Sequence, residues 1–190
     1  MSSPNPKRST LAVRILLMSP TIAVVVAIFV SAVFFGRWRI PQAGMFPTYR
    51  AGGQIIARKS PYSSIADVRR GDIVIYKHMR DGARFDLIWR VVGLPGERVA
   101  IRADAVLVNG RALPQRPLRQ QDGHAIVEET ADGHAYEIAL PTAPDGHGDF
   151  AEVEVSAGHL FALGDNRHEA ADCRSSGPLP FEAIIAKAIW

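Results

Sequence analysis

The chain of 190 residues carries 22 Lys and Arg against 19 Asp and Glu, a net charge of +3, and 47% of its residues are hydrophobic. This length suits one sizeable domain, or a membrane anchor followed by a moderate domain. The one cysteine, Cys173, excludes an intramolecular disulfide and a site built from several cysteines, and the lack of a basic run with interleaved aromatics beyond the N-terminus disfavours nucleic-acid binding.

The N-terminal part of the sequence predicts a membrane anchor. Residues 1–14 are a short polar tail, and the 21 residues 15–35 are uncharged and rich in Val, Ile, Leu and Ala. As a helix they would extend about 30 Å, which matches a bilayer core. Basic residues are slightly more numerous before the segment than after it, which favours a cytoplasmic N-terminus. We therefore predict a single-pass anchor over 15–36 in the inner (plasma) membrane, with 37–190 on the periplasmic or extracytoplasmic side.

A cleaved signal peptide is the alternative interpretation of this segment. Val30-Ser31-Ala32 has the small residues that are typical of a cleavage site. The apolar run is longer than an ordinary signal-peptide core and continues to Phe35, which favours a retained anchor.

Beyond the anchor, the chain is patterned for β structure. Short runs rich in β-branched residues recur at intervals of about ten residues and are bounded by turn residues such as those at 93–96 and 109–110. The predicted strands are 54–58, 73–76, 87–92, 99–101, 105–108, 125–129, 136–139, 151–155 and 160–163. Residues 63–69 predict a single helical turn, and 181–190 predict a last strand or a short helix. This spacing, without a long helical period, favours a mostly β fold built as an antiparallel sandwich or barrel.

Residues 111–150 differ from the rest of this region. They hold four prolines and several Asp-Gly or Gly-His pairs, with weaker strand patterns between them. We interpret them as a smaller and looser insertion, or cap, on the main sheet.

A charged loop is predicted at residues 164–174, which read Gly-Asp-Asn-Arg-His-Glu-Ala-Ala-Asp-Cys-Arg. It follows the apolar run 160–163 and precedes a cluster of turn residues at 175–178. Its charged side chains are able to form ion pairs and side chain-to-backbone hydrogen bonds that brace a neighbouring site, and the alternative is a solvated loop. The four candidate bracing residues are Asp165, Arg167, Asp172 and Arg174.

The charged loop resembles the last signature motif of the type I signal peptidases, the S26 serine peptidases: Gly-Asp-Asn-Arg-x-x-Ser-x-Asp-Ser-Arg. Further blocks are similar to that family in order and spacing: Ile-Pro-Gln-Ala-Gly-Met-Phe-Pro-Thr at 40–48, Gly-Asp-Ile-Val at 71–74 and Arg-Val-Val-Gly-Leu-Pro-Gly-Glu at 90–97. The ending at 180–189 also resembles the family. The resemblance implies an antiparallel β-sheet domain with a variable insertion at 111–150, behind one transmembrane helix.

The residues that do the chemistry in this family are absent here. The family cuts signal peptides with a serine nucleophile and a lysine general base, and the resemblance assigns these two positions to Gly44 and Trp89. Glycine offers no nucleophilic atom, and an indole cannot accept a proton at useful pH. The serine that supports the oxyanion corresponds to Gln42, and the serine that orients the base corresponds to Ala170. We therefore predict that no catalytic residue of the family is intact.

Replacement of the missing groups by other residues is disfavoured. Lys59 and Lys77 end predicted strands, where we expect them to be solvated, and a lysine base must be desolvated to work near neutral pH. His168 and Cys173 are close in sequence, but a lone cysteine beside a histidine on a charged loop is usually incidental. The six histidines show no His-x-x-x-His spacing, so no metal and no cofactor are predicted.

Three functions remain open from the sequence. The first is a membrane-anchored, catalytically inactive relative of signal peptidase that binds exported proteins or signal-peptide-like segments in the family's groove. Such a protein would serve exported substrates, surface-structure subunits or an active signal peptidase. The second is an active signal peptidase with displaced catalytic groups. The third is a structural module of an export or surface-assembly system. The inactive relative predicts that Gly44 and Trp89 lie together and that the Trp89 indole is buried.

Overall fold

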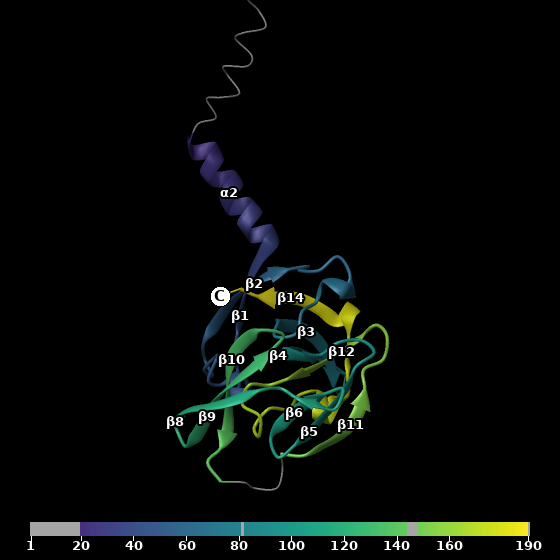
Figure 1. The fold of residues 1–190 in the computed structure, drawn as a ribbon. Helices are drawn as coiled ribbons and strands as arrows, with labels where there is room; N and C mark the ends of the chain where they lie inside the picture. The colour runs from purple at the N-terminus through teal and green to yellow at the C-terminus, as the bar shows by residue number, and fades with distance from the viewer. Residues whose placement is uncertain (1–19, 81, 144–147, 190) are drawn as a thin grey trace, which may run out of the picture.

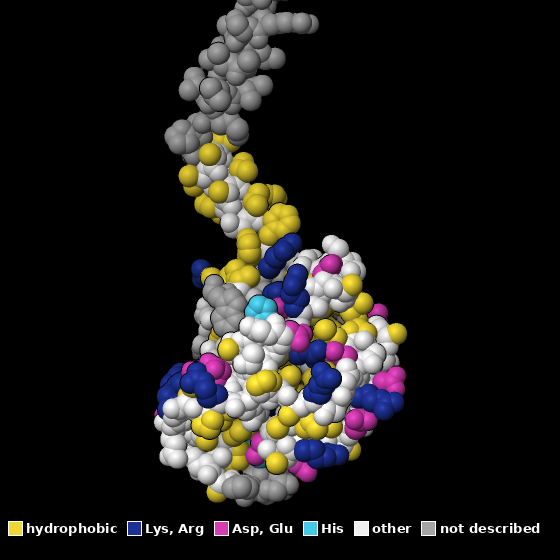
Figure 2. Space-filling view, viewed as in Figure 1, with side chains coloured by type: hydrophobic (Ala, Val, Ile, Leu, Met, Phe, Trp, Pro, Cys, Tyr) yellow, Lys and Arg dark blue, Asp and Glu magenta, His cyan; other side chains and the backbone are white. Residues whose placement is uncertain are grey.

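The computed structural model describes residues 20–80, 82–143 and 148–189 (Figure 1). The predicted tail, residues 1–14, and the first part of the predicted anchor, residues 15–19, lie outside the described residues. Helix α2 (Pro20–Phe34) covers most of the remaining anchor and projects from one end of the β domain. Figure 2 shows this helix covered by hydrophobic side chains, with basic side chains where it meets the domain.

The helix ends earlier than the predicted anchor. Phe35 and Gly36 already belong to strand β1 (Phe35–Arg39), because they pair with Arg58 and Ala57 of the next strand. Among the described residues, no helix combines the length and the apolar character needed to cross a membrane.

The described residues of the β domain form three sheets. The largest has seven strands in the order β1-β2-β14-β3-β4-β12-β13. Beyond β1, its strands are β2 (Gln54–Lys59), β14 (Ile184–Ala188), β3 (Ile73–Arg80), β4 (Ala83–Gly93), β12 (His159–Leu163) and β13 (Leu179–Pro180). A four-stranded sheet has the order β11-β5-β6-β7: Phe150–Glu154, Arg98–Arg102, Ala105–Val108 and Arg111–Ala112. The pairings within these sheets are antiparallel, which confirms the predicted mostly β, antiparallel fold.

The third sheet occupies much of the predicted insertion and is more regular than the sequence indicates. Its strands have the order β10-β9-β8, and we call it the hairpin sheet: His134–Pro141, His124–Ala131 and Gln115–Gln121. It has a small core of its own in which Val127, Tyr136 and Ile138 are buried. Within the predicted insertion, the strands between Gln115 and Pro141 therefore form an ordered layer that packs on the main domain, where a looser segment was expected.

The main core lies where the central strands of the large sheet meet. Val74, Val91 and Phe161 are fully buried, as are most neighbours on their strands. A strand that is buried on both faces reads as a continuous apolar run, which is why residues 160–163 stand out in the sequence. Short helical turns complete the fold: η1 (Ala43–Met45), η2 (Ile65–Asp67), η3 (Phe181–Ala183) and α3 (Cys173–Ser176).

Strand β4 is exposed at its start and buried at its end, and the candidate functional site lies beside it. Its first residues are exposed and its last six are buried. It pairs with β3 from Ala83 to Arg90, whereas β12 pairs with it only at Arg90, Val91 and Gly93. Within the described ranges, no strand pairs with the other edge of β4 over residues 83–89.

Candidate functional site

Gly44 and Trp89 lie against each other. Gly44 sits in the η1 turn, which is held by the Asn166 backbone N–H donating to the Gly44 carbonyl at 3.0 Å. Trp89 is on β4 and is 4% exposed. A β-carbon added at Gly44 would lie 2.7 Å from Cζ3 and Cη2 of the Trp89 ring. The predicted proximity of these residues and the predicted burial of the indole are both confirmed.

The indole fits because its neighbours have almost no side chain. A β-carbon at Gly164 would lie 3.0 Å from Trp89 Cζ3 and would collide with the Ala170 methyl group. That methyl group in turn would be 3.5 Å from a β-carbon at Gly44. Two glycines and an alanine therefore form the space that the ring fills.

The polar edge of the ring is less well accommodated. The Trp89 Nε1 and the Tyr76 hydroxyl are both buried without a hydrogen-bond partner among the described residues. Burial raises the pKa of Tyr76, with Cys173 and Asp172 adding to the effect, and the nearby indole N–H opposes it without reaching hydrogen-bond geometry. A buried N–H without a partner is destabilising, so the apolar contacts of the ring must more than offset this cost.

Asp165 connects the charged loop to strand β4. Its carboxylate accepts two hydrogen bonds from Arg90, at 2.8 and 2.6 Å, and one from the Thr48 hydroxyl. Burial alone would lower the pKa of Arg90, but the Asp165 carboxylate reverses that effect and raises it. Because Arg90 follows Trp89 and Asp165 follows Gly164, this bidentate pair fixes the backbone on both sides of the indole.

Asp172 and Arg174 brace the charged loop from within. The Asp172 carboxylate accepts the Gly164 backbone N–H at 2.9 Å and caps α3 by accepting the Arg174 backbone N–H. The Arg174 guanidinium also donates to it, at 2.8 and 2.7 Å. Asp172 is fully buried, so the bracing interpretation of this loop fits the structure better than the solvated one.

Arg167 reaches in the other direction, to the hairpin sheet. It donates two hydrogen bonds to Glu129, which also accepts from the Tyr136 hydroxyl at 2.7 Å and from Gln115 at 3.0 Å. Burial alone would raise the pKa of Glu129, but the Arg167 charge outweighs it and holds that pKa below its usual range. Sequence reasoning missed Glu129, although its place between Val127 and Ala131 on one face of β9 was a signal for a buried acid.

The residues considered as replacement catalytic groups are not assembled around Gly44. Lys59 donates to the Ala32 carbonyl at 2.9 Å in an exposed position, and Lys77 is exposed. Cys173 is buried, and burial raises the pKa of its thiol to about 12, so it is an inert thiol at neutral pH. His168 faces the Asp104 carboxylate at 2.6 Å.

Two cavities border Trp89. The smaller, about 30 Å³, lies between the η1 turn and β4, and Ile40, Met45 and Ile88 contribute apolar side chains to it. The larger, about 510 Å³, is lined by Phe85 and His78 and reaches α3 at Ser175 and Ser176. Both are lined by Gln42, Leu87 and Trp89, so they adjoin along the unpaired edge of β4.

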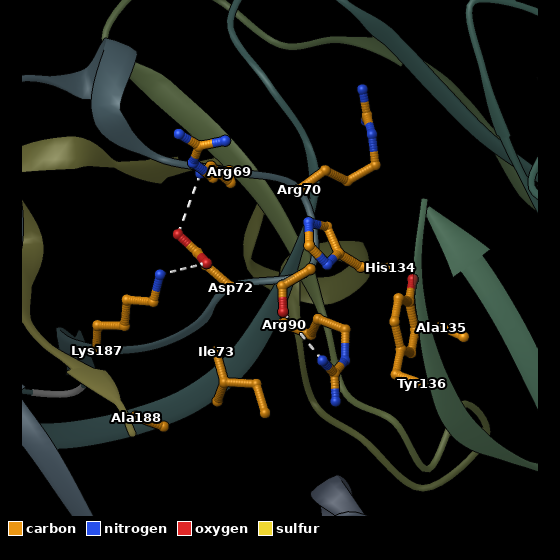
Figure 3. Close-up of a pocket in the computed structure, with 11 residues that line it drawn as sticks. Arg69, Arg70, Asp72, Ile73, Arg90, His134, Ala135, Tyr136, Lys187 and Ala188 are labelled. Atoms are coloured by element: carbon orange, nitrogen blue, oxygen red, sulfur yellow. Dashed lines mark hydrogen bonds and ion pairs between the residues drawn. The ribbon is translucent and has the colours of Figure 1, made fainter. Parts of the chain in front are cut away.

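A further cavity of about 430 Å³ lies between the main sheet and the hairpin sheet (Figure 3). Its wall contains four Lys and Arg side chains, of which Lys187 pairs with Asp72 at 2.6 Å and Arg90 pairs with Asp165. Arg70 pairs with Glu97, also at 2.6 Å. Carboxylates form ion pairs with three of these four cations. We therefore interpret the charged residues in the wall of this cavity as a network that joins the two sheets.

Comparison with known proteins places these features in a family context. The family described as "Signal peptidase, peptidase S26" matches residues 13–190. A signal peptidase I of Bacillus caldolyticus is 29% identical over 171 residues, covering 87% of this chain and 84% of the relative. Signal peptidase I V of Bacillus subtilis (strain 168) is 27% identical over 174 residues, covering 88% and 92%. A crystal structure of a signal peptidase I from Enterococcus faecalis V583 is similar with a TM-score of 0.39 and 24% identity, covering 64% of this chain and 96% of that one.

Proposed function

The chain belongs to the signal peptidase S26 family, and we propose that it is a member that binds exported polypeptides without cleaving them. Membership in this family implies exported proteins that bear signal peptides as its ligands. We call the two adjoining cavities along the edge of β4 the groove. We propose that such a ligand lies in this groove beside Gly44 and Trp89 and stays uncleaved.

The packing of Trp89 against Gly44 is the observation that carries the proposal. Covalent peptide cleavage needs a nucleophile with a base beside it, and these two positions supply neither. The buried ring also occupies the space beside Gly44 in which a nucleophile and a base would have to meet. With Gln42 and Ala170 at the two supporting positions, the site has lost its nucleophile, its base and the hydroxyl that would orient that base.

The unpaired edge of β4 supports binding. Residues 83–89 present backbone N–H and C=O groups along an edge that no described strand covers, and both cavities adjoin it. An extended peptide adds to such an edge by main-chain hydrogen bonds, and the cavities that adjoin the edge leave room for its side chains.

The membrane part of the proposal rests on the sequence of the N-terminal segment. We propose that residues 15–36 anchor the protein in the inner membrane and that the β domain lies on the extracytoplasmic side. The exposed apolar side chains of α2 support this arrangement, since they would otherwise face water.

The test is turnover and binding measured on the same preparation. The full chain in detergent, with a preprotein that an active signal peptidase I cleaves in parallel, should bind the substrate and leave it intact. Binding is measured by anisotropy of a labelled signal-peptide segment, and cleavage by mass spectrometry. Specific cleavage by a preparation shown to be free of host peptidase would overturn the proposal, and so would a complete lack of binding.

A further inference from the structure

The unpaired edge of β4 faces strand β1. In the order of the large sheet, the strands β2, β14 and β3 separate β1 from β4. The Trp38 Nε1 on β1 nevertheless donates a hydrogen bond to the Asp86 carboxylate on β4 at 3.3 Å. The sheet therefore curves until its first strand lies opposite the free edge of β4. We call this contact between the two strands the Trp38–Asp86 bridge.

The side chains at both ends of the bridge are held in place. Trp38 shares one face of β1 with Gly36, and a β-carbon added at Gly36 would lie 2.6 Å from Cζ3 and Cη2 of the Trp38 ring. The ring therefore lies over this glycine because the glycine has no side chain. On β4, the Arg84 guanidinium donates to the Asp86 carboxylate at 3.1 and 3.3 Å. The bridge is thus oriented from both strands.

The bridge lies at the outer end of the smaller cavity. Counted from Trp89 toward the start of β4, Asp86 is the last residue of the strand that lines this cavity, and Trp38 lines neither cavity of the groove. The volume of about 30 Å³ shows that little open space remains between the η1 turn and β4 here. Residues 87–89 therefore lie on one side of the bridge, and residues 83–85 lie on the other.

A peptide strand added to β4 meets the bridge at Asp86. Such a strand places one of its residues directly opposite Asp86, with its side chain on the same face and with β-carbons about 4.5–5.5 Å apart. The Trp38 indole already contacts Asp86, so it competes with that side chain for the same space. The added strand is able to pair with residues 87–89 without meeting the indole, but it cannot continue past Asp86 while the bridge is closed.

We propose, building on the function proposed above, that Trp38 and Asp86 determine how long an extended segment the groove accepts. With the bridge closed, the groove holds a short segment beside residues 87–89. A longer segment must first break the bridge, and the free energy needed to break it lowers the affinity for that segment. Because a single exposed hydrogen bond contributes only modestly, the bridge weakens the binding of long segments without excluding them.

The experiment compares two labelled, terminally blocked peptides, using the full chain in detergent. The short peptide is Ala-Val-Thr-Ala, and the long one carries the same residues with Thr-Val-Thr added at each end, so that in either orientation it passes Asp86. Binding is measured by fluorescence anisotropy. The parent protein should bind the long peptide within about twofold of the short one, because the added residues gain no pairing while the bridge is closed.

Variants of the bridge should change the affinity for the long peptide alone. Trp38→Ala and Asp86→Ala should each tighten its binding by about threefold to tenfold, the range expected for one hydrogen bond. The two substitutions together should add little, because either one already opens the bridge. Asp86→Asn keeps an oxygen that accepts the indole N–H, so it should behave as the parent does.

Ile56→Ala is the matched control for the loss of a large side chain. Ile56 is 50% exposed and lies on β2, the neighbour of β1. It pairs with Arg37, which faces the side of the sheet opposite to Trp38. This variant should leave both affinities unchanged.

The outcomes separate this proposal from the one on which it rests. Trp38→Ala that leaves the long peptide unchanged, or tightens both peptides equally, would overturn the limit on length and keep the non-cleaving function. Asp86→Asn that tightens the long peptide as much as Asp86→Ala would also overturn it, since the charge and not the bridge would then set the limit. Cleavage of either peptide would overturn the non-cleaving function alone, and failure of every variant to bind either peptide would overturn both.

Discussion

The distal edge of the Trp89 indole rests on Gly44, at a distance that leaves no room for a β-carbon on the glycine. The two residues are therefore mutually dependent. The ring occupies its present position only because residue 44 has no side chain, and a side chain at 44 becomes acceptable only when residue 89 is smaller.

This dependence predicts coupling between the two positions. Gly44→Ala should lower the free energy of unfolding by about 1–3 kcal/mol, because a β-carbon placed 2.7 Å from the rigid ring forces it to shift. In a Trp89→Leu background the same substitution should cost much less. Urea unfolding of the four proteins in this double-mutant cycle measures the coupling. Equal costs in both backgrounds would show that the ring does not restrict residue 44.

Removal of the ring should be costly in itself. Trp89→Ala should lower the free energy of unfolding by about 3 kcal/mol, since it leaves a cavity among buried apolar side chains. Trp38→Ala is the matched control, because Trp38 is only partly buried and its Nε1 donates to Asp86 in an exposed position. The control should cost clearly less. An unfolding midpoint that Trp89→Ala does not change would contradict the packing described for this residue.

Rebuilding the family's dyad should restore little activity. Gly44→Ser with Trp89→Lys supplies a hydroxyl and an amine, but Ala170 leaves the amine unoriented and Gln42 leaves the oxyanion position altered. Adding Ala170→Ser and Gln42→Ser should raise preprotein cleavage by more than the sum of the separate pairs, because residues that act as one unit are not additive. Rates from single-turnover assays test this. Full activity from the first pair alone would contradict the roles given to Gln42 and Ala170.

Glu129 predicts a pH dependence of stability. Its folded-state pKa is depressed, chiefly because the Arg167 charge outweighs the effect of burial, so its stabilising contribution is present above the ordinary value of 4.5. The contribution is lost as the pH falls from that value through the lower folded-state pKa. Glu129→Gln should therefore be less stable than the parent at pH 7, and the difference should shrink below about pH 4. Thermal unfolding at several pH values measures it, and a difference independent of pH would contradict the ion pair.

Much of the fold could be predicted because the strands in the core are short apolar runs between turn residues. The buried strand at 160–163 and the turn residues at 93–96 are clear examples. The long β3–β4 hairpin was predicted only in its buried half. Its outer half is exposed and holds several charged residues, with isolated apolar ones such as Met79 and Phe85, so no continuous apolar run marks it.

Strand β8 was obscured for a different reason. It is rich in Arg and Gln and contains Pro117, and it is held by cross-strand ion pairs such as Arg116 with Glu128 at 2.9 Å. Such partners are visible only once the register is known.

Only some contacts of the candidate site could be predicted from the sequence. The order of the motifs was enough to bring Gly44 to Trp89, because each lies at a fixed offset from recognisable neighbours. The partner of Arg167 was not predictable, since Glu129 lies 38 positions away on another sheet.

The position of Trp89 gives the protein a built-in optical probe. The indole is shielded from water and borders both cavities, so a peptide that enters either of them changes the surroundings of a chromophore that is already in place. The chain has three tryptophans, and Trp38 is the other one that the structure describes. A Trp38→Phe, Trp190→Phe protein would carry a single emitter at the centre of the groove, and its emission wavelength would follow occupancy of the groove without any added label.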